Sequence, residues 1–431
     1  MQVFIHSFGC SANTADSEVL AGCLKQAGYQ LASSQTESDI LIFNSCAVKG
    51  PTENRIIDAI KQAPKGKKII VAGCLPMISF ERLLREVKFD AVVGPSVGKK
   101  IVEIVNRVVA GERVVELADL DALPKLDLPN VKSSSLISIV PINYGCLGSC
   151  AYCCVVHARG HLRSYSMKEV TDRVQADVVS GFKEFWVTSQ DTACYGRDIH
   201  SNIAQLLLAL RDVEGDFRVR IGMMTPNMVT DIQQSLIAAF STVKVFKFLH
   251  LPIQSGDDQT LNRMRRFYSV AEFKSILEAF REEFPDLTLA TDVIVGFPGE
   301  TEEAFKNTLK LLEEVKPDVT NVSKFFARPK TAAAKMKDNL VEKEEIKRRS
   351  TVTAELVKRI SLERNLRWVD WEGDVLVDEK GKFEGSWMGR NFAYKPVVLK
   401  SPENLLGKTL QVKVVEVSPT YLKGTITERK Q

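Results

Sequence analysis

Short apolar runs alternate with helical segments over the first part of the chain. Val3–Phe8 and Lys68–Gly73 are apolar and have the length of strands, as do shorter apolar runs near Ile40 and Ala91. Between them, residues spaced for one helix face predict helices over 15–27, 53–62 and 100–110. Strands that alternate with helices are typical of a parallel sheet with crossover helices.

A polar break follows, and then a second alternating region begins. Residues 113–135 contain prolines, mixed charges and three consecutive serines, which is typical of a linker. Beyond them, six apolar runs predict strands: LISIVPI, EFWVTS, VRIGMM, FKFLHLPI, LTLATDVIVG and TNVSKFF. Helical segments such as 167–180, 269–283 and 302–314 lie between these runs. Six βα units in about 200 residues predict a partial or full parallel barrel.

The pattern changes once more near the carboxyl end. Residues 342–367 are charged and have helical spacing. After this helix, short apolar strands are separated by glycine, asparagine and proline turns, which predicts a small antiparallel barrel.

Composition narrows the class of protein only modestly. The 431 residues are 45% hydrophobic and 26% charged, and no apolar run is long enough for a membrane span. The amino-terminal stretch has no basic region of a signal peptide, so we expect a cytoplasmic protein without a membrane partner. Nine cysteines in such a protein favour metal binding over disulfides. The net charge of +4 permits a nucleic-acid partner without indicating one.

Three closely spaced cysteines are the strongest chemical signal. Cys146, Cys150 and Cys153 lie in the string GCLGSCAYC, directly after the first strand of the predicted barrel. Three thiolates can hold three irons of a cubane cluster and leave the fourth iron open for a substrate. A closed structural site is the alternative, and it would need Cys154 or His157 as a fourth ligand.

A second group of cysteines comes from the amino-terminal region. Cys10, Cys46 and Cys74 each follow one of three successive strands. Because the carboxyl ends of parallel strands share one sheet edge, these thiols should converge at that edge. The alternative is that all three are buried core residues.

The CxxxCxxC spacing resembles the signature of the radical S-adenosylmethionine superfamily, with Tyr152 as the aromatic residue before the last cysteine. With the three amino-terminal cysteines and the final small barrel, the whole chain resembles the methylthiotransferases. The resemblance implies a flavodoxin-like α/β domain (1–112), a linker (113–135), a radical-SAM partial (β/α) barrel (136–365) and a TRAM domain that binds RNA (366–431).

The resemblance also implies cofactors and their ligands. Two [4Fe–4S] clusters are expected, one on Cys146, Cys150 and Cys153 that cleaves S-adenosylmethionine, and an auxiliary one on the amino-terminal three cysteines that presents sulfur. Segments that resemble the family's cofactor site place these residues around it: Tyr152, Arg159, Gln190, Gln254, Ser255 and Asp292. Arg159 and Arg163 would bind a carboxylate of cofactor or substrate, or else form scaffold ion pairs. Lys330 stands where the family usually has a glycine.

The strings HARGHLRSY and VTSQDTACYGRDI look like the branch that modifies threonylcarbamoyladenosine at position 37 of tRNA. The alternatives are an aspartate of a ribosomal protein, isopentenyladenosine in tRNA, and a non-catalytic RNA-binding protein. The expected partners are the tRNA anticodon loop and an electron donor such as flavodoxin or ferredoxin, whereas the sequence does not identify the sulfur donor.

The last domain contains the candidate RNA contacts. Lys382, Arg390 and Lys395 are among several cations interleaved with aromatic residues, a combination that suits phosphates and bases. The competing interpretation is that the aromatics form the core of a small barrel and the cations are ordinary surface residues, nearly balanced by acidic ones.

Overall fold

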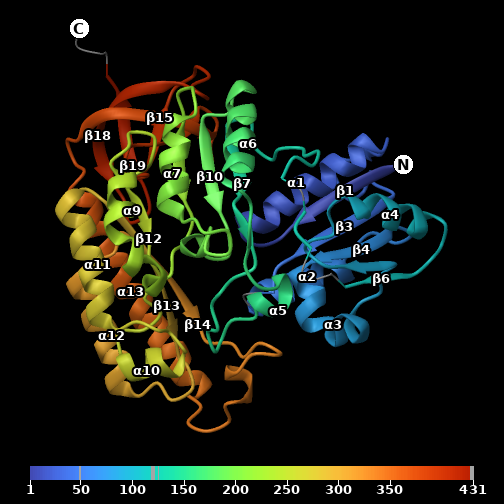
Figure 1. The fold of residues 1–431 in the computed structure, drawn as a ribbon, viewed down its shortest axis with the longest axis horizontal. Helices are drawn as coiled ribbons and strands as arrows, with labels where there is room; N and C mark the ends of the chain where they lie inside the picture. Colours follow the sequence, from blue (N-terminus) through green and yellow to red (C-terminus); the bar gives the residue numbers. More distant parts are fainter. Residues whose placement is uncertain (48–49, 118–121, 125, 428–431) are drawn as a thin grey trace.

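A parallel sheet organises the amino-terminal domain in this computed structural model, which describes residues 1–47, 50–117, 122–124 and 126–427 (Figure 1). The strand order is β2-β1-β3-β4-β5-β6, which is the flavodoxin-like order 2-1-3-4-5 with one strand added. The strands are β1 (Gln2–Ser7), β2 (Gln30–Leu31), β3 (Ile40–Ser45), β4 (Lys68–Gly73), β5 (Ala91–Val93) and β6 (Val114–Glu116). The four strands expected from the sequence are all present, and the two short ones were not predicted.

Helices cover both faces of this sheet. They are α1 (Ser11–Gln26), α2 (Gly50–Lys61), α3 (Cys74–Glu86) and α4 (Ile101–Val109). Alternate residues of β3 point to opposite faces, so that Ile40 and Ile42 pack with α1 and α4 while Leu41 and Phe43 pack with α2 and α3. Strand β6 lies inside the expected linker, whose residues 118–121 and 125 are outside the described part of the chain.

Six parallel strands form the partial barrel of the middle domain, as the six apolar runs predicted. Two three-stranded sheets, β11-β10-β7 and β12-β13-β14, are joined by a bridge between Val219 and Val245. The strands are β7 (Ile137–Pro141), β10 (Glu184–Thr188), β11 (Arg218–Ile221), β12 (Phe248–His250), β13 (Thr288–Val295) and β14 (Val319–Lys324). A small antiparallel pair, β8 (Asn143–Tyr144) and β9 (Arg163–Ser164), brackets the cysteine loop.

Helices pack around the outside of this barrel and bury its apolar side chains. They are α6 (Met167–Val179), α7 (Ile203–Asp212), α8 (Pro226–Val229), α9 (Gln233–Phe240), α10 (Asp258–Arg263), α11 (Val270–Glu283), α12 (Glu302–Val315) and α13 (Lys343–Leu366). The short helix α5 (Val155–Arg159) instead packs against the amino-terminal domain. Capping boxes at Ser166–Glu169 and Ser269–Glu272 fix the starts of α6 and α11. Helix α13 is the predicted long charged helix.

A closed five-stranded barrel ends the chain, in the order β15-β16-β17-β19-β18. Its strands are β15 (Glu372–Lys380), β16 (Ser386–Arg390), β17 (Pro396–Lys400), β18 (Thr409–Val417) and β19 (Leu422–Ile426). Closure was predicted, but one pairing differs from the antiparallel expectation, because β17 and β19 run parallel. Residues 428–431 of the expected domain lie outside the described residues.

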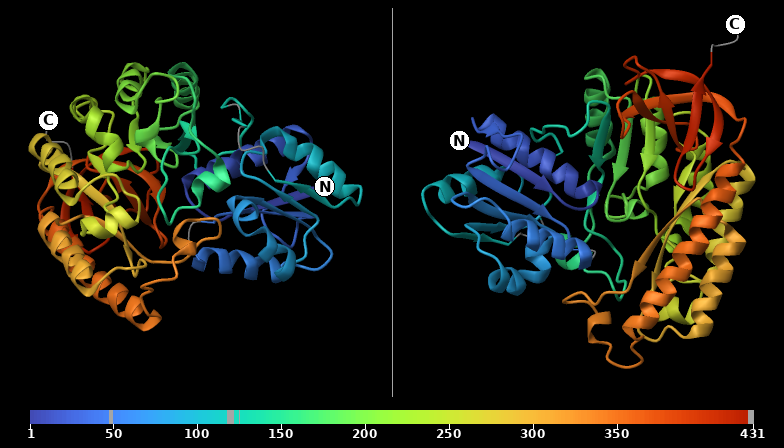
Figure 2. Two further views of the ribbon diagram at one scale, coloured as in Figure 1. Left: turned by 60° about the horizontal axis from the view of Figure 1, so that its bottom comes forward. Right: turned by 180° about the vertical axis from the view of Figure 1, so that it is seen from behind.

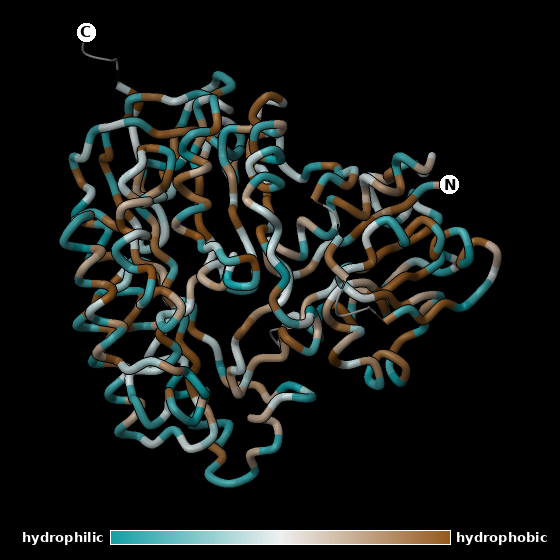
Figure 3. The backbone as a smooth tube through the Cα atoms, viewed as in Figure 1, coloured by the Kyte–Doolittle hydropathy of each residue, from teal (hydrophilic) through white to brown (hydrophobic). Residues whose placement is uncertain are grey.

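The three domains lie side by side, with the amino-terminal sheet and the final barrel on different sides of the middle domain (Figure 2). Hydrophobic residues follow the central strands, while the outer helices α10 to α13 show much hydrophilic surface (Figure 3). In the part of the chain that the structure describes, no helix combines the length and apolarity needed to cross a membrane.

Two carboxyl groups meet in the buried contact between the partial barrel and the final barrel. Glu184 of β10 accepts hydrogen bonds from the Tyr394 hydroxyl (2.9 Å) and from Trp186 Nε1 (2.6 Å). Asp378 of β15 is 3% exposed and accepts from Arg390 Nε (3.2 Å). Burial, followed by the charge of Glu184, raises the pKa of Asp378 to about 9. Asp378 therefore keeps its proton near neutral pH.

We expect the protein to lose stability as the pH rises from about 4 to about 9. In this window the folded state retains the Asp378 proton and the unfolded state releases it, which costs up to about 1.4 kcal/mol of unfolding free energy per pH unit. Asp378→Asn should flatten this slope, whereas Asp172→Asn, at an exposed helical position, should leave it unchanged. Anaerobic thermal unfolding between these pH values measures the slope for each variant. Equal slopes for Asp378→Asn and wild type would refute the claim that Asp378 retains its proton in the folded state.

Candidate iron–sulfur and substrate site

Each of the three closely spaced thiols receives a hydrogen bond from a nitrogen. The loop that carries them leaves the carboxyl end of the first barrel sheet, between β8 and α5. The backbone N–H of Gly148 donates to Cys146 Sγ (3.1 Å), and that of Val155 donates to Cys153 Sγ (3.5 Å). Arg266 Nη1 donates to Cys150 Sγ (3.2 Å). Such N–H···S bonds stabilise the thiolates that bind a cluster and influence the reduction potential of that cluster.

A glycine lies close to these thiols. A Cβ atom added at Gly148 would lie 3.2 Å from Cys146 Sγ and 3.7 Å from Cys150 Sγ. The loop therefore folds closely around the sulfur atoms, as a loop that wraps a cluster must. Burial raises the pKa of the Cys153 thiol well above its usual value, so a metal is needed to hold it as a thiolate.

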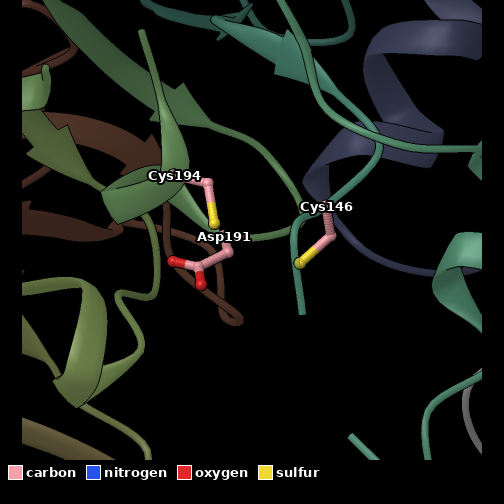
Figure 4. A group of neighbouring side chains, drawn as sticks. All are labelled: Cys146, Asp191 and Cys194. Atoms are coloured by element: carbon pink, nitrogen blue, oxygen red, sulfur yellow. The ribbon is translucent and has the colours of Figure 1, made fainter. Parts of the chain in front are cut away.

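A fourth thiol, from Cys194, lies beside this loop (Figure 4). Among the described residues, one set of potential metal ligands has all its ligand atoms within 4.8 Å of one another, and it consists of Cys146, Asp191 and Cys194. A hydrogen bond from Cys194 lowers the pKa of Cys146. Thiolates that bind three different irons of a cluster lie farther apart than the ligands of a single ion, so the other cysteines need not lie within 4.8 Å of one another. Cys194 therefore lies close to Cys146, whereas the fourth ligands considered from the sequence, Cys154 and His157, are not part of this set.

The residues expected around a cofactor lie in several different settings. Gln190 Oε1 is buried and has no hydrogen-bond partner among the described residues, at the carboxyl end of β10. Gln254 has a left-handed backbone (φ 69°), and its N–H donates to the Asp292 carbonyl (2.8 Å). The Asp292 carboxylate accepts from Asn321 Nδ2 (2.8 Å) and lies 3.1 Å from His250 Nε2. An unpaired polar atom and a polar strand end suit a bound polar ligand.

Two other expected cofactor residues are packed against protein. The Ser255 side chain is buried and its hydroxyl pairs with Thr308 of α12 (3.4 Å). Tyr152 contacts Phe297 edge to face, with ring centroids 6.5 Å apart. The sequence did not single out Arg266, although it is the last residue of the segment that starts at His250 and supplied Gln254 and Ser255.

The three amino-terminal cysteines end adjacent strands, as expected. Cys10 precedes α1 after β1, Cys46 follows β3, and Cys74 begins α3 after β4. A Cβ atom added at Gly9 would lie 2.8 Å from the Cys46 Cβ, so the loop before Cys10 lies against Cys46. Cys46 and Cys74 are each 6% exposed, and Cys10 is exposed. Burial raises the pKa of Cys74 to about 12, an effect that the nearby Arg159 opposes.

Arg159 has other partners than the expected cofactor. Its Nε donates to Cys74 Sγ (3.3 Å), and its Nη2 forms a 2.5 Å ion pair with Asp16. Both partners belong to the amino-terminal domain. Helix α5, which ends at Arg159, lies between that domain and the middle domain (Figure 1). Arg163 donates to the carbonyl of Arg159 (2.7 Å). The Arg159 ion pair agrees with the scaffold interpretation that the sequence left open.

The structure corrects the candidate RNA contacts at Lys395 and Arg390. The Lys395 ammonium is buried and donates to Asp318 (2.7 Å) and Asn365 (2.8 Å). Arg390 is paired with Asp378 in the contact between the barrels. Both cations are therefore used in domain packing, which charge counting along the sequence cannot distinguish from a basic surface. Lys382 is exposed.

The loop after β14 ties the middle domain to the amino-terminal domain. Arg328 forms a buried 2.6 Å ion pair with Glu53 of α2, and Lys330 Nζ donates to the Met77 carbonyl of α3 (2.9 Å). Lys330 has φ 67°, a conformation that glycine adopts without strain. The lysine therefore has a backbone conformation that suits glycine, and its side chain adds a hydrogen bond between domains. Lys330 and Phe326 line a cavity of about 720 Å³.

Three family descriptions match successive parts of the chain. The description "Uncharacterized protein family UPF0004" matches residues 2–94, "Radical SAM superfamily" matches 140–312, and "TRAM domain" matches 372–427. The order agrees with the three domains of the structure.

Curated relatives are similar over the whole length. A probable threonylcarbamoyladenosine tRNA methylthiotransferase of Pyrococcus horikoshii is 40% identical over 429 residues, which is 99% of each chain. The human threonylcarbamoyladenosine tRNA methylthiotransferase is 34% identical over 98% of this chain and 73% of its own. Among solved structures, the radical S-adenosylmethionine methyltransferase TsrM of Kitasatospora setae shares the fold, with a TM-score of 0.57 and 14% identity, and the match covers 77% of this chain and 74% of TsrM.

Proposed function

The chain belongs to the threonylcarbamoyladenosine tRNA methylthiotransferases, and from that premise we propose that it converts N6-threonylcarbamoyladenosine at position 37 of tRNA into its 2-methylthio form. The observation that carries the proposal is the full-length similarity to archaeal and eukaryotic relatives of that name. The two groups of three cysteines, on separate domains, supply the chemistry that the reaction needs.

A radical S-adenosylmethionine methylthiotransferase uses S-adenosylmethionine and [4Fe–4S] clusters. When bound, S-adenosylmethionine would supply the methyl group and a radical able to activate an unreactive carbon–hydrogen bond, and the auxiliary cluster would present the sulfur. We assign Cys146, Cys150 and Cys153 to the cluster that cleaves the cofactor. We assign Cys10, Cys46 and Cys74 to the auxiliary cluster.

The chain's own residues hold and orient these groups. The N–H groups of Gly148 and Val155 and the guanidinium of Arg266 neutralise charge on the three thiolates of the radical site. The unpaired Oε1 of Gln190 and the polar strand end at Gln254 and Asp292 would face S-adenosylmethionine, and Tyr152 lies within the cluster loop. The packing of Ser255 against Thr308 supports an indirect role, in which Ser255 fixes the backbone next to Gln254.

The tRNA substrate accounts for the final domain. Its match to the TRAM description, and the exposed Lys382 on its surface, support contact with tRNA phosphates. An anticodon loop exposes bases that can be unstacked and brought to a buried site. A flavodoxin or ferredoxin would deliver the electrons, and both partners favour a cytoplasmic location.

Nucleoside mass spectrometry of tRNA from a strain that lacks the gene tests the proposal. We expect the 2-methylthio nucleoside to disappear and threonylcarbamoyladenosine to accumulate, with restoration by the wild-type gene. The ribosomal proteins and the isopentenyladenosine derivatives of the same strain serve as controls, and both should be unchanged. An unaltered tRNA profile, or loss of a methylthio group from a ribosomal aspartate, would refute the assignment.

A further inference from the structure

We propose that Arg159 is a positioning residue of the auxiliary cluster, so that the middle domain completes a site that the amino-terminal domain begins. The inference rests on the proposed function in one respect, namely that Cys10, Cys46 and Cys74 hold a cluster. It adds that a guanidinium from the other domain donates to Cys74 and sets the reduction potential of that cluster.

The position of α5 between the two cysteine groups supports this proposal. The helix starts directly after Cys153 and Cys154 and ends at Arg159. Its buried side packs against the amino-terminal domain, in a cluster formed by Ala47, Cys74, Met77, Ile78, Cys154 and Ala158. The Cys154 thiol donates to the Ala47 carbonyl (3.5 Å), next to Cys46. One short helix therefore begins at the radical cysteines and ends at the auxiliary ones.

The environment of Arg159 keeps its charge directed at Cys74. The side chain is 3% exposed, and its Nε lies 3.3 Å from Cys74 Sγ. Asp16 accepts from the neighbouring donor Nη2 of the guanidinium, and it also accepts from the Tyr144 hydroxyl. The Tyr144 ring lies 5.4 Å from the guanidinium carbon. Because arginine is always charged, a permanent cation with a fixed donor lies against this thiol.

The radical site has a matching arrangement. Arg266 is 6% exposed, donates to Cys150 Sγ at 3.2 Å through Nη1, and is held by Tyr268 through Nε at 3.1 Å. Each group of three cysteines thus has one buried guanidinium donor, and both donors come from the middle domain. A hydrogen bond and a positive charge at a ligand sulfur stabilise the reduced, more negative cluster and raise its potential.

Redox titrations followed by electron paramagnetic resonance test the proposal in full-length protein without S-adenosylmethionine or tRNA. Cys146, Cys150 and Cys153 are replaced by alanine to isolate the auxiliary cluster, and the mirror variant isolates the radical cluster. In the protein with only the auxiliary cluster, we combine Asp16→Asn with Arg159→Gln so that no buried charge is left unpaired. This double variant should lower the reduction potential of the auxiliary cluster. We expect at least a tenfold change in the reduction equilibrium, or about 59 mV for one electron.

Two further variants separate electrostatics from folding. Asp16→Asn alone removes a negative charge and keeps the Arg159 donor, so it should shift the auxiliary potential upward. Arg159→Lys keeps the cation opposite Asp16 and should restore cluster content, but with a potential below that of wild type. Arg266→Gln is the matched control. It should lower the reduction potential of the radical cluster and leave that of the auxiliary cluster unchanged.

The outcomes distinguish this proposal from the proposed function. Absence of iron at the auxiliary site in otherwise wild-type protein would refute the cluster assignment itself. With that iron present, an auxiliary potential unchanged by the double variant would overturn the role of Arg159. Loss of iron from both sites alike in the Arg159 variants would also overturn it, whereas loss confined to the auxiliary site, restored by Arg159→Lys, would support it.

Discussion

Replacing Cys150 by alanine will abolish cleavage of S-adenosylmethionine. The substitution removes one of three thiolates, and the buried Arg266 guanidinium loses the sulfur to which it donates at 3.2 Å. We expect the release of 5′-deoxyadenosine under strict anaerobiosis with a reductant to fall by a factor on the order of 10⁴ or more, as for other essential catalytic groups. Chromatography of the nucleoside product measures this loss.

The adjacent Cys154 provides the matched control for that experiment. Its thiol points to the Ala47 carbonyl in the amino-terminal domain, and not to the loop around Gly148. Cys154→Ala should therefore keep both the cluster and the cleavage activity. If Cys154→Ala loses iron to the same extent as Cys150→Ala, the site has four protein ligands and the open-iron assignment is wrong.

Replacing Cys10, Cys46 and Cys74 together by alanine will separate radical formation from product formation. Iron should fall from about eight to about four atoms per chain, because one of two cubane clusters is lost. The radical cysteines and their three N–H donors are unchanged, so 5′-deoxyadenosine release should persist. The methylthio nucleoside should fall below detection. Iron analysis, Mössbauer spectroscopy and nucleoside mass spectrometry of treated tRNA measure the three quantities.

Cys23→Ala is the control for this triple variant. Cys23 is buried in α1 among core residues and is in the same domain, so its replacement tests for general destabilisation. It should leave the iron content near eight atoms per chain, even if the yield of protein falls. Methylthio product formed by the triple variant at the wild-type rate would contradict the role of the auxiliary cysteines.

The placement of the three amino-terminal cysteines at one sheet edge could be predicted because it depends on strand order. Parallel strands end at one sheet edge, so residues that follow β1, β3 and β4 must lie close together wherever the helices pack. The six barrel strands were predictable for a similar reason, since buried parallel strands are continuous apolar runs. The strands β2 and β6 were missed because they are short and each includes a polar residue, whereas the equally short β5 is entirely apolar and was predicted.

Side chains that cross between domains were not predictable. The partners of Arg159 and Lys395 are 143 and 77 residues away, and nothing in the local pattern identifies Asp16 or Asp318 as their counter-ions. A cation next to aromatic residues looks the same whether it faces RNA or a neighbouring domain. Cys194 shows the same limit, because only the folded chain places its thiol beside Cys146.

The contact between the final barrel and the middle domain has a consequence for how a long substrate is positioned. Hydrogen bonds across that contact join Lys395 to Asp318, Tyr394 to Glu184 and Lys183 to Gly407; the first is buried and the other two are partly buried. The barrel and the cysteine loop are therefore parts of one stiff frame. A tRNA gripped at the barrel would meet the reactive edge at a set spacing, so the enzyme would select its nucleoside by distance along the RNA as well as by chemistry.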